Sequence, residues 1–295
     1  RSGRRGGRAR LISPPMIRPR DVAEGVGAFP TRTPTLPPAT HTQSYALGTR
    51  QLLLIEPATP YADEQRAFLD WARSLVSSGR EILGIVLTHH HIDHVGGAQT
   101  FSHELGVPLW AHEATAARLP ELDISRRLDD DEVLTLDGPS PQAWRVLHTP
   151  GHAPGHICLF EPELGAVVVG DMVASEGTIL IEPTDGDMAE YLRQLARLEA
   201  VGAKTALPAH GDPIPEPSQL FAHYVAHRLE RERKVAAALE AAGSGGTTDL
   251  SLVPRAYADT PRAAWPLALL SVRAHLVKLV ADGRARTDGE RYWTP

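Results

Sequence analysis

Cysteine is almost absent from this chain, and long hydrophobic runs are missing from it. Its 295 residues include one cysteine, Cys158, which excludes an intrachain disulfide. We therefore expect a reducing, cytoplasmic location, with Cys158 packed as a small buried hydrophobic residue in its apolar run. No run of consecutive apolar residues approaches the roughly 18–20 needed to cross a bilayer, so we expect no membrane partner.

Positive charge is scarce outside the first 20 residues. Those residues hold seven arginines and no acid, and subtracting them from the formal net charge of −6 leaves −13 on residues 21–295. Nucleic-acid binders usually present a basic face, so this charge argues against tight RNA binding unless a local basic groove overcomes it. The Arg-rich start lacks the apolar core of a secretory signal, and we expect a disordered tail there, with an RNA-binding arm as the alternative.

The rest of the chain alternates between the strand and helix periods. Apolar residues near a 3.6-residue period predict amphipathic helices, and short β-rich or continuous apolar runs predict strands. The expected helices are residues 63–75, 97–105, 188–201, 220–242 and 264–281. The expected strands are residues 26–29, 44–47, 51–55, 82–87, 107–110, 143–147, 156–160, 166–169 and 205–207. This order predicts an α/β fold with layered sheets flanked by helices.

The character of the chain changes after Pro217. Two long helical stretches are separated by a Gly- and Ser-rich loop that ends at Thr248, a residue suited to cap a helix. Residues 285–293 contain an Asp-Gly pair, which is the turn signal of a β-hairpin. We therefore predict three parts: a basic tail at residues 1–20, a main domain at 21–216 and a small winged-helix-like domain at 217–295.

The strongest chemical signal is the run Thr88-His-His-His-Ile-Asp-His-Val-Gly-Gly97, which follows a predicted buried strand. Imidazole and carboxylate are ligands that Zn²⁺ accepts in proteins. Residues at i and i+2 leave a turn at different angles, so His89 and His91 can hold one ion. Asp93 and His94 can then point at a second ion.

Three further candidate ligands recur where later predicted strands give way to loops. They are His152, Asp171 and His210, each next to a glycine that allows close backbone approach to an ion. Sites in layered α/β proteins form at the carboxyl ends of strands, where loops converge. Taken together, the seven residues divide into two ligand sets with one shared carboxylate, unlike a solvated His-rich loop.

The run at residues 88–97 resembles the His-x-His-x-Asp-His loop of the metallo-β-lactamase superfamily, in the version found in hydroxyacylglutathione hydrolases (glyoxalase II). The resemblance covers about residues 25–214 and implies an αββα sandwich with two metal ions at one edge of its sheets. We expect Zn²⁺, although iron or manganese can occupy such sites. The first ion would be held by His89, His91 and His152, the second by Asp93, His94 and His210, and Asp171 would bridge both.

The resemblance also implies the chemistry. A water held by two zinc ions loses a proton near neutral pH, and the bridging hydroxide would attack a carbonyl carbon or a phosphorus. Asp93 would be the catalytic residue that orients this hydroxide. His90 occupies the variable position of the motif and is not expected to bind metal, whereas His156 is expected to steer a ligand or loop. No Gly-x-Ser-x-Gly elbow supports a serine nucleophile.

The C-terminal part resembles the β-lactamase-like-protein-2 subfamily, which includes endoribonucleases and thioesterases that release polyketides. The resemblance rests on His223-Tyr-Val-Ala-His-Arg228, on the Arg-Glu pair at 231–232 and on the winged-helix-like outline. His223 and His227 share a helix face and, with Arg228, are candidate substrate-binding residues. A polar helix surface is the alternative. We expect the winged-helix-like unit to pack over the active site rather than to read DNA.

Three functions stay open at this point. The first is hydrolysis of a small-molecule ester or thioester, favoured by the glyoxalase-like loop and the acidic globule. The second is an endoribonuclease acting on single-stranded RNA, favoured by the C-terminal resemblance and the Arg-rich tail; the negative charge of the rest counts against it unless a local basic groove, for example with Arg228 and Arg231, overcomes that charge. The third is a non-hydrolytic metal-binding regulator or a mononuclear iron oxygenase, which metal analysis distinguishes. Nothing in the sequence specifies an oligomeric state.

Overall fold

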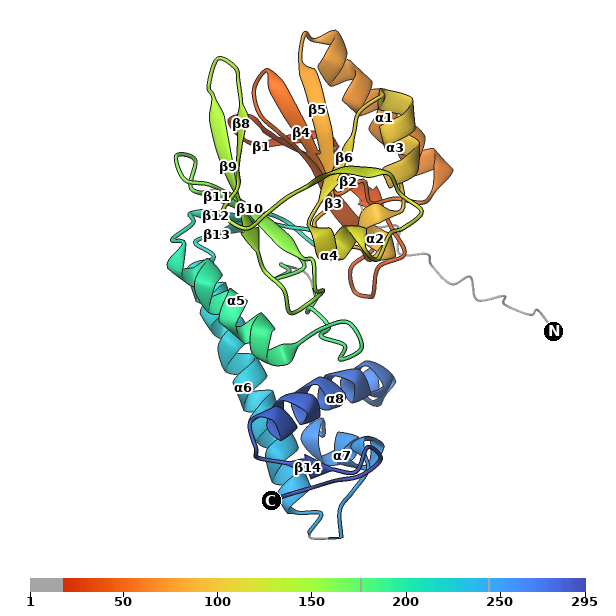
Figure 1. Cartoon of the computed structure of the whole chain (residues 1–295), viewed down its shortest axis with the longest axis vertical. Helices are drawn as coiled ribbons and strands as arrows, with labels where there is room; N and C mark the ends of the chain where they lie inside the picture. Colours follow the sequence, from red (N-terminus) through yellow and green to blue (C-terminus); the bar gives the residue numbers. More distant parts are fainter. Residues whose placement is uncertain (1–17, 176, 244) are drawn as a thin grey trace, which may run out of the picture.

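Two β-sheets packed face to face form the larger part of the computed structural model, which describes residues 18–175, 177–243 and 245–295 (Figure 1). The first sheet contains, in order, β1 (Arg20–Ala23), β2 (Val26–Arg32), β3 (His41–Leu47), β4 (Gln51–Ile55), β5 (Glu81–Val86), β6 (Leu109–Ala111) and β7 (Ile124–Arg127). The second contains, in order, β13 (Ile214–Pro215), β12 (Thr205–Pro208), β11 (Ala166–Gly170), β10 (Ile157–Glu161), β9 (Gln142–His148) and β8 (Val133–Leu136).

Helices cover the outer face of each sheet, so the predicted αββα sandwich is confirmed (Figure 1). The first sheet is flanked by α1 (Ala62–Ser77), α2 (Ile92–Val95), α3 (Ala98–Leu105) and α4 (Glu113–Ala116). The second is flanked by α5 (Met188–Ala200) and the first half of α6 (Ser218–Glu240). Strand β4 shows why its sequence is continuously apolar: Leu52 and Leu54 pack under the helices, whereas Leu53 and Ile55 pack between the sheets.

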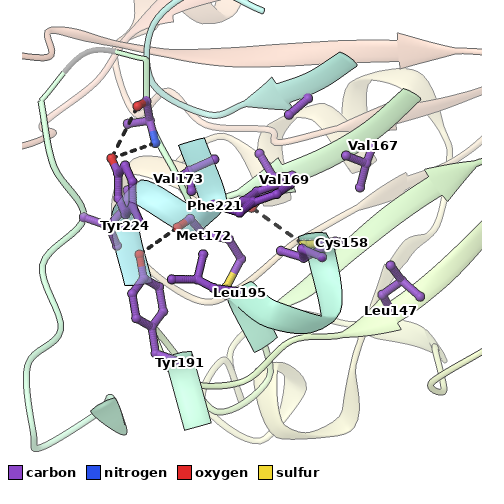
Figure 2. Packing of buried hydrophobic residues seen from close by; sticks show 14 of the residues in the cluster. Leu147, Cys158, Val167, Val169, Met172, Val173, Tyr191, Leu195, Phe221 and Tyr224 are labelled. Carbon is purple, nitrogen blue, oxygen red and sulfur yellow. Dashed lines mark hydrogen bonds between the residues drawn. The ribbon is translucent and has the colours of Figure 1, made fainter. Parts of the chain in front are cut away.

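The core outside the second sheet positions the chain that follows β11. Cys158 is fully buried there, as expected, with its Sγ 3.7 Å from the carbonyl oxygen of Val169 (Figure 2). Burial raises the pKa of the Cys158 thiol to about 12, so the group stays a thiol at neutral pH. Two tyrosine hydroxyls on the helices bind the backbone of the residues that follow β11. Tyr191 donates to Met172 O at 2.7 Å, and Tyr224 accepts from Ala174 N at 3.2 Å (Figure 2).

The C-terminal unit contains α7 (Asp249–Ala256), the short 3-10 helix η1 (Arg262–Ala264), α8 (Trp265–Ala281) and a hairpin of β14 (Arg286–Thr287) and β15 (Tyr292–Trp293). Thr248 caps α7 by accepting a hydrogen bond from Ser251 N, as its sequence position predicted. Helix α6 belongs to both parts, because Phe221 packs in the sandwich core and Leu239 in the C-terminal core. Figure 1 shows α6 running from the sandwich down to this unit.

The structure differs from the sequence predictions mainly at short elements. Strands β7 and β8 and helices α2 and α4 were not predicted, because each has four residues and too little periodicity to recognise. Residues 1–17 of the predicted tail lie outside the described residues. Its last residues belong to the fold, since Arg18 donates to Pro30 O at 3.1 Å and Arg20 begins β1.

One helical stretch is long and apolar enough to cross a membrane by length and composition. It is Arg262–Ala281, and 39% of its most apolar window is buried inside the protein. Its apolar character has a local reason, since Val272, Leu276 and Leu279 fill the core of the C-terminal unit. Core helices of soluble proteins pass the same test, so the observation is weak evidence for a membrane span.

His275 in α8 is a buried imidazole whose two nitrogens have no hydrogen-bond partner among the described residues. Burial, reinforced by the positive charges of Arg228 and Lys278, lowers its pKa to about 3. The unfolded chain binds this proton below about pH 6.5 and the folded chain does not, so stability is lost as the pH falls from 6.5 toward 3.

Replacing His275 by leucine is therefore expected to raise the free energy of unfolding by about 1 kcal/mol at pH 7.5, by removing unsatisfied polar atoms. At pH 5 the gain over wild type is expected to be larger by up to about 2 kcal/mol. Wild type loses stability there because its unfolded chain binds a proton at His275, and the leucine variant has no such loss. Urea unfolding at both pH values measures this difference, with His103→Leu, a change at an 86%-exposed side chain, as the control. A gain that is equal at the two pH values would contradict the titration argument.

Candidate metal centre

The seven predicted ligands emerge at the carboxyl ends of strands that meet at one edge of the sandwich. The run at 88–97 follows β5, and His152 follows β9. Strands β11 and β12 are parallel neighbours, so Asp171 and His210, which follow them, leave the sheet side by side. The sheet topology thus brings together residues up to 121 positions apart in the sequence, from His89 to His210.

Three imidazoles form the first cluster. His89 Nε2 lies 3.1 Å from His91 Nδ1, and His152 Nε2 lies 2.9 Å from the same atom. All three ligand atoms are close enough to hold one ion. These are the residues predicted for the first metal position.

Asp93, His94 and His210 form the second cluster, again with one ligand atom each close enough to share an ion. Asp93 Oδ2 lies 3.9 Å from His94 Nε2 and 3.6 Å from His210 Nε2. These are the residues predicted for the second metal position.

The carboxylate of Asp171 lies between the two clusters. Its Oδ2 is 3.5 Å from His152 Nε2 in the first cluster. Its Oδ1 is 3.5 Å from His94 Nε2 and 3.3 Å from His210 Nε2 in the second. One oxygen therefore faces each cluster, which is the arrangement that a shared ligand requires.

The backbone at Asp171 is held in place by His156. The Asp171 amide donates to His156 Nε2 at 3.0 Å, so His156 positions the residue, as the sequence predicted. The preceding Gly170 has φ +47°, and a Cβ there would lie 2.6 Å from His156 Nε2. Only glycine fits this turn without displacing the imidazole.

Buried atoms without partners show that the residues present fit a divalent metal. Asp171 Oδ1 and His94 Nε2 have no hydrogen-bond partner among the described residues. Buried polar atoms are normally satisfied, and leaving them without a partner is costly. Nitrogen and oxygen donors of this kind match the ligand preference of zinc and similar ions.

The electrostatics of the site favour neutral imidazoles at His89 and His152 and positively charged ones at His94 and His210, through lowered and raised pKa values respectively. Burial lowers the pKa of His152 to about 4, so it is neutral and able to bind metal at pH 7. Burial alone would raise the pKa of Asp171, but His210 and His94 outweigh it and hold that pKa well below its usual range. Burial would lower the pKa of His94, but Glu56 and Asp171 raise it well above its usual value. The carboxylates therefore stabilise a cation here.

Glu56 is a functional candidate that the sequence predictions missed. It follows β4 at the same edge, is 1% exposed and adopts φ 59°, an unusual conformation for a residue with a side chain. Its Oε1 accepts from the hydroxyl of Thr88 and lies 3.1 Å from His94 Nδ1, although the latter contact lacks hydrogen-bond geometry. Its position at a strand end is the same signal that identified Asp171, so it was detectable.

Asp185 is a second missed candidate. Its Oδ2 lies 2.8 Å from His91 Nε2 and 3.3 Å from His90 Nε2, and its Oδ1 accepts from Arg118 Nε at 3.2 Å. His91 Nδ1 faces the first cluster. Asp185 therefore binds the other nitrogen, Nε2, of the same ring. Asp185 lies in a loop without a motif, so no sequence signal could have found it.

The predicted substrate-binding residues lie on α6, away from the metal clusters. His223 and His227 are exposed, with ring centroids 6.4 Å apart, whereas Arg228 is buried. A cavity of about 260 Å³ beside the clusters is walled mainly by residues 34–39 and 177–182. None of the three α6 residues lines it; His227 and Arg228 line an adjoining cavity instead.

Comparison with known proteins agrees with this architecture. The family model described as "Metallo-beta-lactamase superfamily" matches residues 36–210, which is more than half of the chain. The chain belongs to the metallo-β-lactamase superfamily. A second model, "Beta-lactamase associated winged helix domain", matches residues 248–293 of this superfamily member, so the predicted C-terminal winged-helix-like unit is also confirmed.

Individual relatives match this metallo-β-lactamase superfamily member over two thirds of its length or more. The "Beta-lactamase-like protein 2 homolog" of Caenorhabditis elegans is 29% identical over 249 residues, which are 82% of this chain and 79% of the relative. The "Atrochrysone carboxyl ACP thioesterase" of Aspergillus fumigatus is 29% identical over 205 residues, 68% of this chain and 60% of the relative. A metallo-beta-lactamase family protein from Thermus thermophilus shares the fold, with a TM-score of 0.74 and 24% identity over 92% of this chain and 99% of that one.

Proposed function

We propose that the protein is a metal-dependent hydrolase of ester or thioester bonds in small molecules. The observation that carries the proposal is the Asp171 carboxylate, which has one oxygen toward each of two clusters of metal-binding side chains. Two divalent ions, Zn²⁺ rather than iron or manganese, would be held by His89, His91, Asp93, His94, His152, Asp171 and His210.

The ions, when bound, would supply Lewis acidity that lowers the pKa of water and polarises a carbonyl oxygen. Asp93 lines the cavity and accepts a hydrogen bond from the attacking water, which orients it. The water oxygen forms a bond to the carbonyl carbon, the C–S or C–O bond breaks, and the leaving thiol or alcohol takes up a proton. Asp185 holds the ring of His91 in position, and the Glu56 carboxylate places a negative charge beside His94.

The cavity beside the clusters favours acyl substrates over RNA. Its described lining contains no lysine or arginine, and apolar residues such as Leu36, Ile179 and Leu180 form much of its wall. A phosphodiester backbone needs cationic contacts, whereas an acyl group needs apolar surface. The thioesterase named among the relatives supports the same choice. The single, buried cysteine fits a cytoplasmic location.

The test is a parallel assay of the zinc-loaded protein with S-lactoylglutathione, a panel of acyl-CoA thioesters and labelled single-stranded RNA. We expect thioester hydrolysis that a chelator stops. Cleavage of RNA with a steep salt dependence, together with inert thioesters, would reverse the assignment in favour of the endoribonuclease. Elemental analysis separates the third hypothesis, because one iron per chain indicates an oxygenase and two zinc ions do not.

Replacing Asp185 by asparagine is expected to lower metal affinity or kcat/KM by about 10- to 100-fold, the usual effect of losing a carboxylate that orients a metal-binding imidazole. The change keeps the size of the side chain and removes the charge that holds His91 Nε2. Zinc titration against a competing chelator and thioester kinetics measure it. Glu121→Gln, an exposed carboxylate elsewhere, is the matched control. Unchanged metal affinity and kinetics would show that Asp185 does not position His91.

A further inference from the structure

A second cavity adjoins the metal cavity, between the sandwich and the C-terminal unit. Its volume is about 390 Å³, and it shares Leu36, Pro37 and residues 178–180 with the metal cavity. Its remaining walls come from α6, α8 and the segment between α7 and α8. Because both cavities contact the same two loops, one substrate can reach from the metal clusters into the second cavity.

Arg228 gives this second cavity a positive charge that no acid in the described residues neutralises. The residue is 4% exposed, its Nη2 donates to Ile179 O, and its Nε has no hydrogen-bond partner. No acidic side chain appears in the described lining, and no ion pair of Arg228 is found in this part of the chain. Its neighbour Arg231, by contrast, pairs with Asp259 at 2.9 Å. Burying a cation without an anion beside it costs free energy, unless a bound anionic ligand pairs with the cation.

Two tyrosines, Tyr191 and Tyr224, connect the surroundings of Arg228 to the segment that follows Asp171. The Arg228 guanidinium lies 5.6 Å from the ring centroid of Tyr191, whose hydroxyl donates to Met172 O beside Asp171 (Figure 2). Tyr224, one turn earlier on α6, binds the backbone of Ala174 in the same loop. An anion at Arg228 is therefore only a side chain away from the residues that follow Asp171.

Much of the remaining wall of the cavity is suited to a hydrocarbon. Leu36, Leu180, Leu267 and Ala268 contribute apolar surface to the same cavity as Arg228. An apolar wall with one cationic end matches a substrate whose body is apolar and whose end is anionic.

We propose that this second cavity binds the acyl part of the substrate and that Arg228 binds a carboxylate at its far end. The inference rests on the proposed function and narrows the substrate class to thioesters or esters of acids that carry a second carboxylate. Arg228 acts as a specificity-determining residue, since it contacts the substrate away from the bond that breaks.

The test compares pairs of S-acyl thioesters of four to eight carbons, in which one member ends in a carboxylate and the other in a methyl group. The wild-type protein is expected to show at least about tenfold higher kcat/KM for the carboxylate member of the best pair. Arg228→Met should lower kcat/KM for the carboxylate member at least about tenfold more than for the methyl member, which removes the preference. Arg233→Met, which removes an exposed charge on the same helix, should keep it.

Three results would overturn the inference, two in the kinetics and one in ligand binding. A wild-type protein that does not prefer the carboxylate member excludes the subsite, whatever the variants do. If Arg228→Met lowered kcat/KM equally for both members of the pair, Arg228 would only support the loop at Ile179 and would not bind the carboxylate of the substrate. Calorimetric binding of pimelate against heptanoate separates this outcome from failure of the proposed hydrolysis. Stronger binding of pimelate that Arg228→Met abolishes supports the subsite even if no thioester is cleaved, and equal binding of the two acids contradicts it.

Discussion

Replacing Asp171 by alanine is expected to abolish hydrolysis. Its carboxylate lies within 3.5 Å of His94, His152 and His210, so its loss removes a candidate ligand from both clusters at once. The effect on kcat/KM should exceed the roughly 100-fold that marks the loss of an outer, orienting carboxylate. Metal content per chain, measured by elemental analysis, should fall together with turnover. His91→Ala is expected to behave in the same way through the first cluster.

The matched control is Asp212→Ala. This carboxylate lies two residues after His210, pairs with Arg20 and has a side chain that is 78% exposed. The substitution makes the same change of charge and volume near the site without removing a ligand, so activity and metal content should remain close to wild type. Purified, folded Asp171→Ala with wild-type turnover on a cleaved substrate would disprove the two-ion assignment.

Removing the metal is expected to inactivate the protein and also to destabilise it. Ions that bind only the folded chain stabilise it by about 3–4 kcal/mol at 100 to 1,000 times their dissociation constant. For a protein of this size that corresponds to about 5–15 °C in the midpoint of thermal unfolding. The physical reason is local: without a cation, buried atoms of Asp171 and His94 lose their partner, and the Asp93 carboxylate stays crowded beside Asp171.

Thermal unfolding with and without a chelator measures this loss, and added Zn²⁺ should restore both the midpoint and the activity. Asp171→Ala provides an internal control, because its midpoint should respond much less to the chelator. If chelated, metal-free wild type kept its turnover and its midpoint, the proposed function would fail. The carboxylate preference of the second cavity would then be judged by the binding of the dicarboxylic acid alone.

The seven candidate ligands could be located from the sequence because local rules place such residues. A buried strand followed by a turn exposes consecutive side chains in different directions, which makes the run at 88–97 recognisable from its spacing alone. Strand ends followed by glycine identified Asp171 and His210 by the same reasoning. Glu56 follows β4 in the same way, and it escaped notice only because a lone glutamate after a strand is common.

The substrate side of the site was not predictable to the same degree. His223, His227 and Arg228 are spaced as neighbours on one helix, yet the first two are exposed and the third is buried. Helical spacing predicts which residues share a face of the helix, but not which segments of the protein pack against that face. The loop at 178–180, more than 40 positions earlier in the chain, decides what Arg228 contacts.

By itself, the sequence determined the secondary-structure order, the strand-end positions of the seven candidate ligands and the family resemblance, because these follow from short-range periodicity and fixed spacing. Only the tertiary structure decided that Asp185 binds His91 Nε2, that Glu56 lies beside His94 and that Arg228 is buried without an acid. These depend on contacts between segments distant in the chain, whose geometry the packing of two sheets and one long helix sets.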